Sequence, residues 1–305
     1  YKMGNGVNDS VTGTLTTKNE AGATTAFPDF TMYSVRDIQG STNPHDDGLA
    51  TQTPALNDIF SMSSNLSISG WFKTTDTGTL FSNTGGAAAT GMSCEITTSS
   101  IGIKFQDGVP SPIVPVTDVN DGEWHHIVVT KNTSQEFKIY IDGNVRITQT
   151  PSGITNADLN GNNGFTLLGD GQNNAHVTCP SNTDSSKLNA TLSNWSIHNE
   201  VLDVNAVAQL YSNGHVRNIK NLPSVNVSSI KGWWQLNNQS NPLQDSVSTN
   251  NLIYQSAAGL PNISSELVDA TGATLVEKTI NGNAITLSLT KSFNFTTKEL
   301  SLIHI

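Results

Sequence analysis

The segment from Asp121 to Gly143, DGEWHHIVVTKNTSQEFKIYIDG, constrains the fold more than any other part of the chain. It opens with an Asp-Gly turn dipeptide, and residues 124–130 are mostly β-branched and aromatic. A polar stretch follows, and residues 137–141 then alternate Phe, Lys, Ile, Tyr and Ile before a second Asp-Gly. Alternation of this kind marks a half-buried strand, and Asp-Gly is a preferred dipeptide of tight hairpins. The segment therefore predicts an antiparallel β-hairpin.

Short apolar segments separated by turn signals lie on both sides of this hairpin. Residues 66–72, LSISGWF, alternate as a half-buried strand does. Further short strands are expected at 80–81, 93–97, 101–105, 113–116, 165–168 and 187–197. This spacing leaves no room for the crossover helices of a parallel sheet. The sequence therefore predicts an all-β sandwich or jelly roll.

One short helix is expected after the last of these strands. Asp203 is a suitable N-cap, because its carboxylate can accept hydrogen bonds from the free amides of the first turn. Gly214 is suited to the left-handed conformation that ends many helices. The residues expected to share the apolar face of this helix are Val204, Val207, Ala208 and Tyr211.

These segments resemble one family. Four segments are similar to parts of the laminin G-like jelly rolls of the concanavalin A-like lectin and glucanase superfamily. They are the pattern D-G-x-W-H-H-hydrophobic at 121–127, the pattern hydrophobic-Y-hydrophobic-D-G at 139–143, the strand at 66–72 and the piece LDVNAVAQLYSNG at 202–214. The resemblance implies a concanavalin A-like antiparallel β-sandwich with one short closing helix and β-rich flanking segments. The family's usual opening, F-D-G-x-x-D-Y, is missing from residues 30–59.

The chain also partly repeats itself at an offset of about 233 residues, which is typical of tandem modules. Three segments match at this offset: Tyr1-Lys-Met-Gly-Asn with Trp234-Gln-Leu-Asn-Asn, Pro28-Asp29 with Pro261-Asn262, and Phe60-Ser-Met-Ser-Ser with Phe293-Asn-Phe-Thr-Thr. A fourth match needs a three-residue gap and pairs Asp9-Ser10-Val11 with Asp245-Ser246-Val247. A chance origin stays open, because Asn and Ser are abundant.

The predicted organisation has four parts. Residues 1–26 end a preceding linker or module, 27–216 form the jelly roll, 217–299 are a linker and the start of a second similar module, and 300–305 are an artefact. The last part, LSLIHI, reads like a translated transposase end from a sequencing library, as in a metagenomic or transcriptomic fragment. Because the chain begins at Tyr1 rather than Met, we expect its true start to be missing.

The amino-acid composition limits the kinds of partner that the protein is expected to bind. Charged residues make up 13% of the chain and the net charge is -10, with no Lys/Arg cluster that could neutralise phosphates. The sequence therefore argues against nucleic acid. No apolar run reaches the length of a membrane span, which predicts no membrane insertion. Polarity comes mainly from Asn, Ser, Thr and Gly, which suits tight turns and a neutral hydrogen-bonding surface.

The acidic residues predict a protein without enzymatic activity. The resemblance implies that catalytic relatives carry paired acids in an E-x-D-x-E arrangement, and glycoside hydrolysis needs two carboxyl groups. None of the eight Glu here is followed two positions later by an acid, and Glu95 stands alone on an expected strand. His125 and His126 are neighbours on a strand, so their rings should lie on opposite faces and not share a metal. The tryptophans expected in the core are Trp71, Trp124 and Trp195.

The favoured ligand-binding loop follows the strand at 165–168. Its residues Asp170, Gln172, Asn173 and Asn174 offer one carboxylate and several amides, which suit a sugar or, at Asp170, calcium. Asp46-Asp47 is a second candidate for calcium, and a solvated turn is the alternative at both places. Cys94 and Cys179 could form one disulfide or remain two separate thiols.

The sequence thus favours a non-enzymatic binding or adhesion module that recognises a glycan or a surface protein ligand. We expect it to belong to a large extracellular protein or a phage structural protein, located outside the cell or on the virion, with tandem modules in the same chain. The alternative is a purely structural module that decorates a fibre or capsid. A glycoside hydrolase is less favoured.

Overall fold

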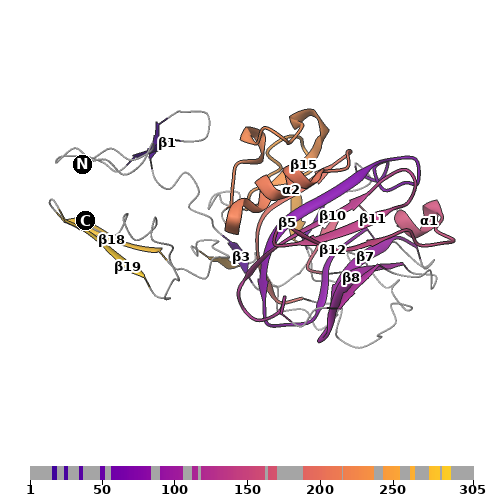
Figure 1. Ribbon diagram of the computed structural model, residues 1–305, viewed down its shortest axis with the longest axis horizontal. Helices are drawn as coiled ribbons and strands as arrows, with labels where there is room; N and C mark the ends of the chain where they lie inside the picture. Colours follow the sequence, from indigo (N-terminus) through magenta and orange to yellow (C-terminus); the bar gives the residue numbers. More distant parts are fainter. Residues whose placement is uncertain are drawn as a thin grey trace.

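The chain folds mainly into strands of two antiparallel sheets packed face to face (Figure 1). This computed structural model describes residues 16–18, 24–26, 34–36, 49–51, 56–83, 90–105, 112–115, 118–161, 164–169, 188–214, 216–236, 243–254, 262–264, 275–281 and 284–289. The predicted all-β sandwich with few helices is confirmed.

The eight-stranded sheet contains the predicted hairpin. Its strands run in the order β12-β11-β10-β5-β14-β3-β17, and β15 also pairs with β14. The bounds are β3 Ser34–Arg36, β5 Leu66–Thr74, β10 Trp124–Lys131, β11 Phe137–Ile141, β12 Asn144–Gln149, β14 Ala190–His198, β15 Ile230–Trp234 and β17 Asn262–Ser264. β10 and β11 form the hairpin, with Ile127 opposite Ile141. The edge strand β12 was not predicted.

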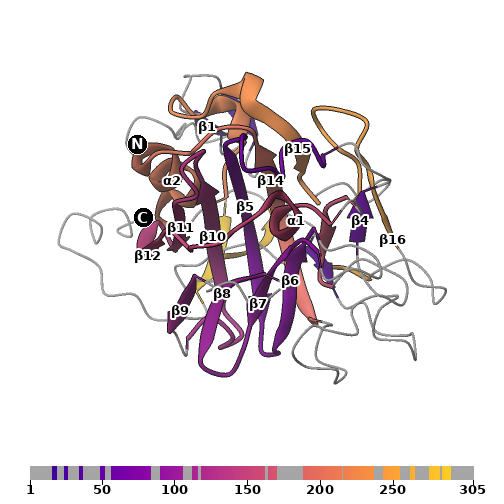
Figure 2. The same ribbon diagram turned by 90° about the vertical axis from the view of Figure 1, so that its right-hand side faces the viewer.

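The seven-stranded sheet has the order β16-β4-β13-β6-β7-β8-β9, and Figure 2 shows β9 and β16 at its two ends. The bounds are β4 Leu49–Thr51, β6 Gly78–Ser82, β7 Met92–Ile96, β8 Ser100–Phe105, β9 Ile113–Pro115, β13 Thr166–Leu167 and β16 Leu252–Tyr254. Two separate hairpins complete the strands: β1 Thr16–Lys18 with β2 Thr24–Ala26, and β18 Leu275–Asn281 with β19 Ala284–Leu289.

The interior between the two sheets is built around aromatic rings. Trp195 projects from β14 and packs edge-on against Phe81 of β6, with ring centroids 6.0 Å apart. Gly70 makes room for this indole, because a Cβ at Gly70 would lie only 2.1 Å from a ring carbon of Trp195. Phe165 stacks on Trp234 at 5.5 Å, so β15 contributes directly to the core. The expected burial of Trp71, Trp124 and Trp195 is confirmed.

Strand β10 is apolar on both of its faces for a structural reason. Ile127 and Val129 point into the interior, whereas Val128 belongs to a second buried cluster. In Figure 1, α2 (Val204–Tyr211) lies on the side of the sheet that faces away from β7 and β8. This layer also contains the 3-10 helices η3 (Ile219–Asn221) and η4 (Val227–Ser229). A strand buried on both faces needs a continuous apolar run.

The predicted helix is present, but its buried face is different. The carboxylate of Asp203 accepts a hydrogen bond from the Ala206 amide at 2.8 Å, as an N-cap does. The structure buries Ala206, Val207 and Leu210. Val204 is 63% exposed, so its expected place in the core is wrong. Ala208 is exposed as well, and Tyr211 is half-buried with its ring stacked on Trp71, so the predicted apolar face is only partly the buried one.

The four-part division of the chain remains a prediction. β15 and β16 lie beyond residue 216, and they pair with β14 and β4 of the sandwich. In the described part of the chain, no helix combines the length and apolar character needed to cross a bilayer.

Candidate functional site

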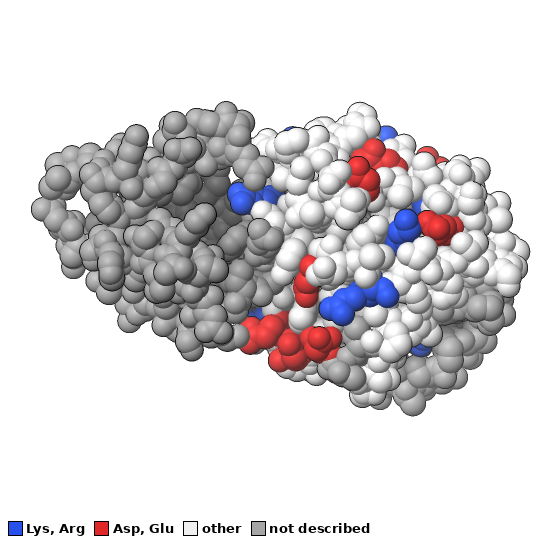
Figure 3. Space-filling view, viewed as in Figure 1, with Lys and Arg blue, Asp and Glu red and all other residues white. Residues whose placement is uncertain are grey.

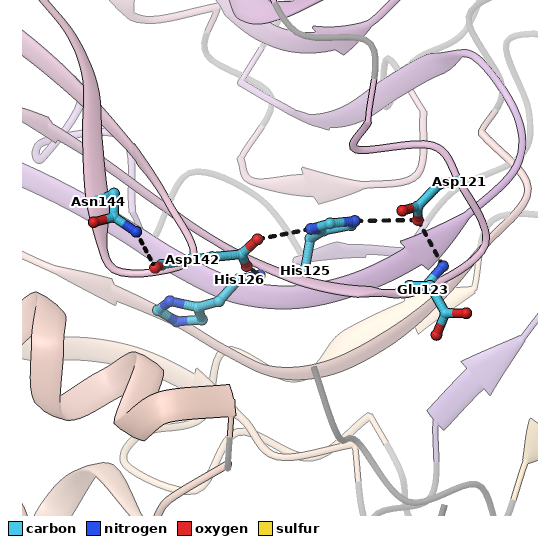
Figure 4. Close-up of polar contacts among 6 residues, drawn as sticks. All are labelled: Asp121, Glu123, His125, His126, Asp142 and Asn144. Atoms are coloured by element: carbon cyan, nitrogen blue, oxygen red, sulfur yellow. Dashed lines mark hydrogen bonds and ion pairs between the residues drawn. The ribbon is translucent and has the colours of Figure 1, made fainter. Parts of the chain in front are cut away.

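The sequence motif around Asp121 and Asp142 forms a clamp at the end of the β10–β11 hairpin (Figure 4). His125 lies between the two carboxylates, with Nδ1 2.8 Å from Asp142 Oδ2 and Nε2 3.2 Å from Asp121 Oδ1. The other oxygen of Asp142 accepts a hydrogen bond from the His126 amide at 2.8 Å. Asp121 also accepts one from the Glu123 amide. Each of the two carboxylates therefore binds both the His125 ring and a backbone amide of the motif.

Both ring nitrogens of His125 are engaged, which limits its chemistry. Burial lowers the pKa of His125, but the hydrogen bonds and charges of Asp142 and Asp121 outweigh burial and raise the pKa above its ordinary value of 6.5. Because the folded-state pKa is raised, this stabilisation is fully present below about pH 6.5 and is lost as pH rises through the folded-state pKa. A histidine held by carboxylates on both sides is poorly placed to act as a general base.

We expect Asp142→Ala to lower the free energy of unfolding by about 2–4 kcal/mol, because it removes the acceptor of the part-buried His126 amide and of His125 Nδ1. Urea unfolding followed by circular dichroism measures this. Asp121→Ala is the matched control, because its carboxylate is more exposed, and we expect less than about 1 kcal/mol. Equal losses in the two variants would contradict the dominant role of Asp142.

His126 occupies a different environment, as predicted for the neighbouring strand position. Its Nε2 lies 3.0 Å from Ser69 Oγ, and its ring packs on Trp71 with centroids 4.9 Å apart. Among the described residues, its Nδ1 and the indole nitrogens of Trp71 and Trp124 find no hydrogen-bond partner. The described residues contain no group of three or more His, Cys, Asp or Glu that could hold a metal ion. The two rings thus lie in different surroundings, as the alternation of side chains along a strand requires.

A row of polar side chains crosses the outer face of the seven-stranded sheet. Thr166, Ser82, Ser93 and Lys104 are cross-strand neighbours on β13, β6, β7 and β8. Glu95 lies two residues beyond Ser93 and pairs with Lys104, and it accepts a hydrogen bond from Ser93 Oγ at 3.2 Å. We call these five residues the polar row. The side chains of Lys104 and Glu95 are 27% and 11% exposed, so this end of the row reaches solvent.

Glu95 is the only acidic residue in the seven strands of this sheet. A glycosidase needs two carboxyl groups on opposite sides of a sugar bond, one of them protonated. Glu95 instead has an ammonium partner. The described strands of this face therefore lack the pair of acids that hydrolysis requires.

The predicted ligand loop begins where the polar row ends. Ser82 Oγ donates a hydrogen bond to the carbonyl of Gly169 at 2.9 Å, which ties the start of the loop to β6. Asp170, Gln172, Asn173 and Asn174 lie outside the described residues, so their roles remain predictions. The polar row itself was not predicted, although alternation of Ser93 and Glu95 with apolar neighbours was the available signal.

The remaining candidates are only partly described. Cys94 is fully buried on β7, and burial, with the nearby charge of Glu95, raises the pKa of its thiol. Cys179 and Asp46-Asp47 lie outside the described residues, so the disulfide and the second calcium loop remain predictions.

Comparison with known families decides the classification. The profile of the concanavalin A-like lectin/glucanases superfamily, in its laminin G-like form, matches residues 45–208, which is more than half of the chain. The chain belongs to this superfamily. The resemblance stated from residues 66–72, 121–143 and 202–214 is thereby confirmed. No curated protein matches the chain.

Solved structures with similar folds come from several organisms. A candidate carbohydrate-binding protein of Bacteroides ovatus is 13% identical, with a TM-score of 0.49, and the match covers 77% of this chain and 60% of that protein. The heptameric SAP-like pentraxin of Limulus polyphemus is 16% identical, with a TM-score of 0.44 and coverage of 74% and 96%. IT-sialidase CBM40 of Ruminococcus gnavus is 14% identical, with a TM-score of 0.44 and coverage of 57% and 94%.

Proposed function

We propose that this concanavalin A-like domain is a non-catalytic binding module that recognises a glycan. The observation that carries the proposal is the outer face of the seven-stranded sheet. There the polar row leads into the loop that starts at Gly169, while its single carboxylate, Glu95, is paired with Lys104. The hydroxyls of Thr166, Ser82 and Ser93 are buried, so the donors and acceptors for sugar hydroxyls would come from Glu95 and Lys104 at the solvent end of the row and from the carboxylate and amides of residues 170–174.

The surface charge supports a neutral ligand. On the face shown in Figure 3, acidic and basic side chains are scattered over a mostly uncharged described surface. A strongly charged ligand would favour a patch of opposite sign, since such patches steer charged partners. A neutral polysaccharide places no such demand on the surface.

Calcium is part of this proposal as an additional ligand of the loop at 170–174. Asp170 would supply a carboxylate and Asn173 and Asn174 would supply amide oxygens, which are the hard oxygen donors that Ca²⁺ prefers. We further propose that the module works outside the cell or on a virion surface, where such glycans are met. A surface protein is the alternative ligand.

A glycan array probed with the full chain, with calcium and with EDTA, tests the proposal. We expect binding to a defined set of glycans, and Asp170→Ala should weaken it by about 10-fold or more, because it removes a charged hydrogen-bonding group. Asn144→Ala is the matched control, since Asn144 is exposed at a turn of the other sheet. Uniformly blank arrays would favour the purely structural role, and polysaccharide cleavage abolished by Glu95→Gln would establish a hydrolase instead.

A further inference from the structure

The chain contains nine Asn-x-Ser/Thr sequons, which begin at residues 8, 65, 132, 189, 194, 226, 238, 262 and 294. An N-linked carbohydrate is bulky, so a folded protein accommodates it only at the surface. Its acceptor motif is an Asn amide with a hydroxyl two residues later, and both groups must be accessible. The structure describes the exposure of all three residues for the sequons that begin at Asn65, Asn132, Asn189, Asn194 and Asn226. These sequons can therefore be compared directly.

Three of these sequons lie at least partly within paired strands. Asn194 is only 6% exposed in the middle of β14. The hydroxyls of the sequons at Asn65 and Asn189 belong to Ser67 of β5 and Thr191 of β14, and both of these residues are buried. None of the three therefore presents an amide and a hydroxyl together at the surface.

The sequon at Asn132 lies at the tip of the β10–β11 hairpin. Thr133 and Ser134 are exposed, but Asn132 is half-buried. Its Oδ1 accepts hydrogen bonds from the amides of Ser134 and Glu136, at 2.9 and 3.0 Å, which turn the side chain back onto the hairpin. The motif is thus only partly accessible.

The sequon at Asn226 is exposed at all three of its positions. Asn226 is the N-cap of η4, and its Oδ1 accepts hydrogen bonds from the amide of Ser228 at 3.2 Å and from the hydroxyl of Ser228 at 2.8 Å. Among the residues that the structure describes, its Nδ2 has no hydrogen-bond partner. The amide and the hydroxyl of the motif therefore lie side by side, and the amide nitrogen is open.

Asn226 also lies away from the candidate ligand-binding face. The preceding residue, Val225, is buried in the same cluster as Val207 and Leu210 of α2. Figure 1 places α2 on the outer side of the eight-stranded sheet, whereas the polar row crosses the outer face of the seven-stranded sheet. A carbohydrate on Asn226 would leave the polar row open. It would also shield the neighbouring Val227, which is 45% exposed.

We propose that Asn226 is an acceptor of N-linked carbohydrate, an inference that rests on the proposed location of the protein outside the cell. The donor is an oligosaccharide joined through a diphosphate to a lipid. Nδ2 of Asn226 forms a bond to C1 of the first sugar while the bond from C1 to the diphosphate oxygen breaks. The lipid diphosphate leaves with the bonding electrons, and one amide proton passes to a base of the transferase.

The test uses the full 305-residue chain, secreted from a eukaryotic cell behind an added secretion signal. N-linked carbohydrate is removed enzymatically in heavy-oxygen water, which converts each occupied Asn to a labelled Asp that peptide mass spectrometry detects. We expect label at Asn226 in most molecules and none at the buried Asn194. Near-ultraviolet circular dichroism confirms that the secreted chain is folded.

Val227→Pro is the decisive variant, because proline between Asn and Ser abolishes the acceptor motif and leaves both residues in place. Asn226 has φ −75° and ψ 105°, which a following proline allows, and residue 227 is the first position of η4, where proline is tolerated. We expect this variant to fold and to lose the label at Asn226. Ser228→Ala should also lose it, and Ser228→Thr should keep it.

Asn218→Gln is the matched control. Asn218 is the N-cap of η3 and accepts a hydrogen bond from the amide of Lys220 at 3.0 Å, but it lacks a hydroxyl two residues later. This variant should carry the same carbohydrate as the unmodified sequence. An unlabelled Asn226 in the folded, secreted chain, or label that survives Val227→Pro, overturns the proposal. A glycan array probed with the Val227→Pro variant reports on the binding function separately, so either proposal can fail without the other.

Discussion

A fragment of residues 27–216, the predicted jelly roll alone, will not fold into a stable sandwich. It lacks Trp234, Leu236, Leu243 and Leu252, which the structure buries between the sheets. Removing one large buried side chain costs about 2–5 kcal/mol, and the whole stability of a domain is about 5–15 kcal/mol. The fragment also lacks part of the second buried cluster, namely Ile219, Leu222, Val225, Ile230 and Trp233. The free energy lost with these side chains together exceeds the whole stability expected of the domain.

The measurement is a thermal melt of purified 27–216 beside a matched fragment of residues 27–254. We expect the longer fragment to unfold cooperatively and the shorter one to lack near-ultraviolet signal and a cooperative transition. The longer fragment also retains the hydrogen bond from Trp233 Nε1 to Asn194 Oδ1, at 2.7 Å, which anchors β15 to the bulge in β14. A cooperative melt of 27–216 at a similar temperature would refute this prediction.

The features that could be predicted from sequence were those encoded by local patterns. The period-two alternation of residues 137–141 and the Asp-Gly pairs specify a hairpin without help from the rest of the chain. The N-cap at Asp203 is equally local. In contrast, β12 is an edge strand whose residues are largely exposed. Its sequence therefore shows no alternation of apolar and polar residues from which a strand could be predicted. The role of β15 as part of this sandwich depends on pairing with a strand about 40 residues earlier, which no local pattern encodes.

In the candidate site, too, features within one strand could be predicted from the sequence, whereas features that join different strands could not. The sequence alone predicts that Glu95 has no second acid beside it on the same strand face, because residues on one face of a strand lie two positions apart. Its partner Lys104 could not be predicted, because the pair forms across β7 and β8 and depends on their register. The polar row is likewise a cross-strand feature of four strands. A single sequence reveals which residues share a strand face but not which strands are neighbours.

Acid should unfold the protein between about pH 6.5 and pH 4 through two buried histidines. Burial lowers the pKa of His126 to about 3 and that of His198 to about 4, below their ordinary value of 6.5. Both rings stay neutral in the folded chain and become charged on unfolding, so the unfolded state binds two more protons. The stability they contribute is present above pH 6.5 and is lost as pH falls, at about 2.7 kcal/mol per pH unit for two groups.

Urea unfolding at pH values from 4.5 to 8 measures this slope. Replacing His198 with Gln should reduce the slope between pH 4.5 and 6 by about half, since one of the two titrating groups is gone. His126→Gln should do the same. His125→Gln is the matched control: the raised pKa of His125 keeps that ring protonated in both states below about pH 6.5, so its removal leaves the acid slope unchanged. If His125→Gln flattened the slope and His198→Gln did not, the two environments would have been assigned the wrong way round.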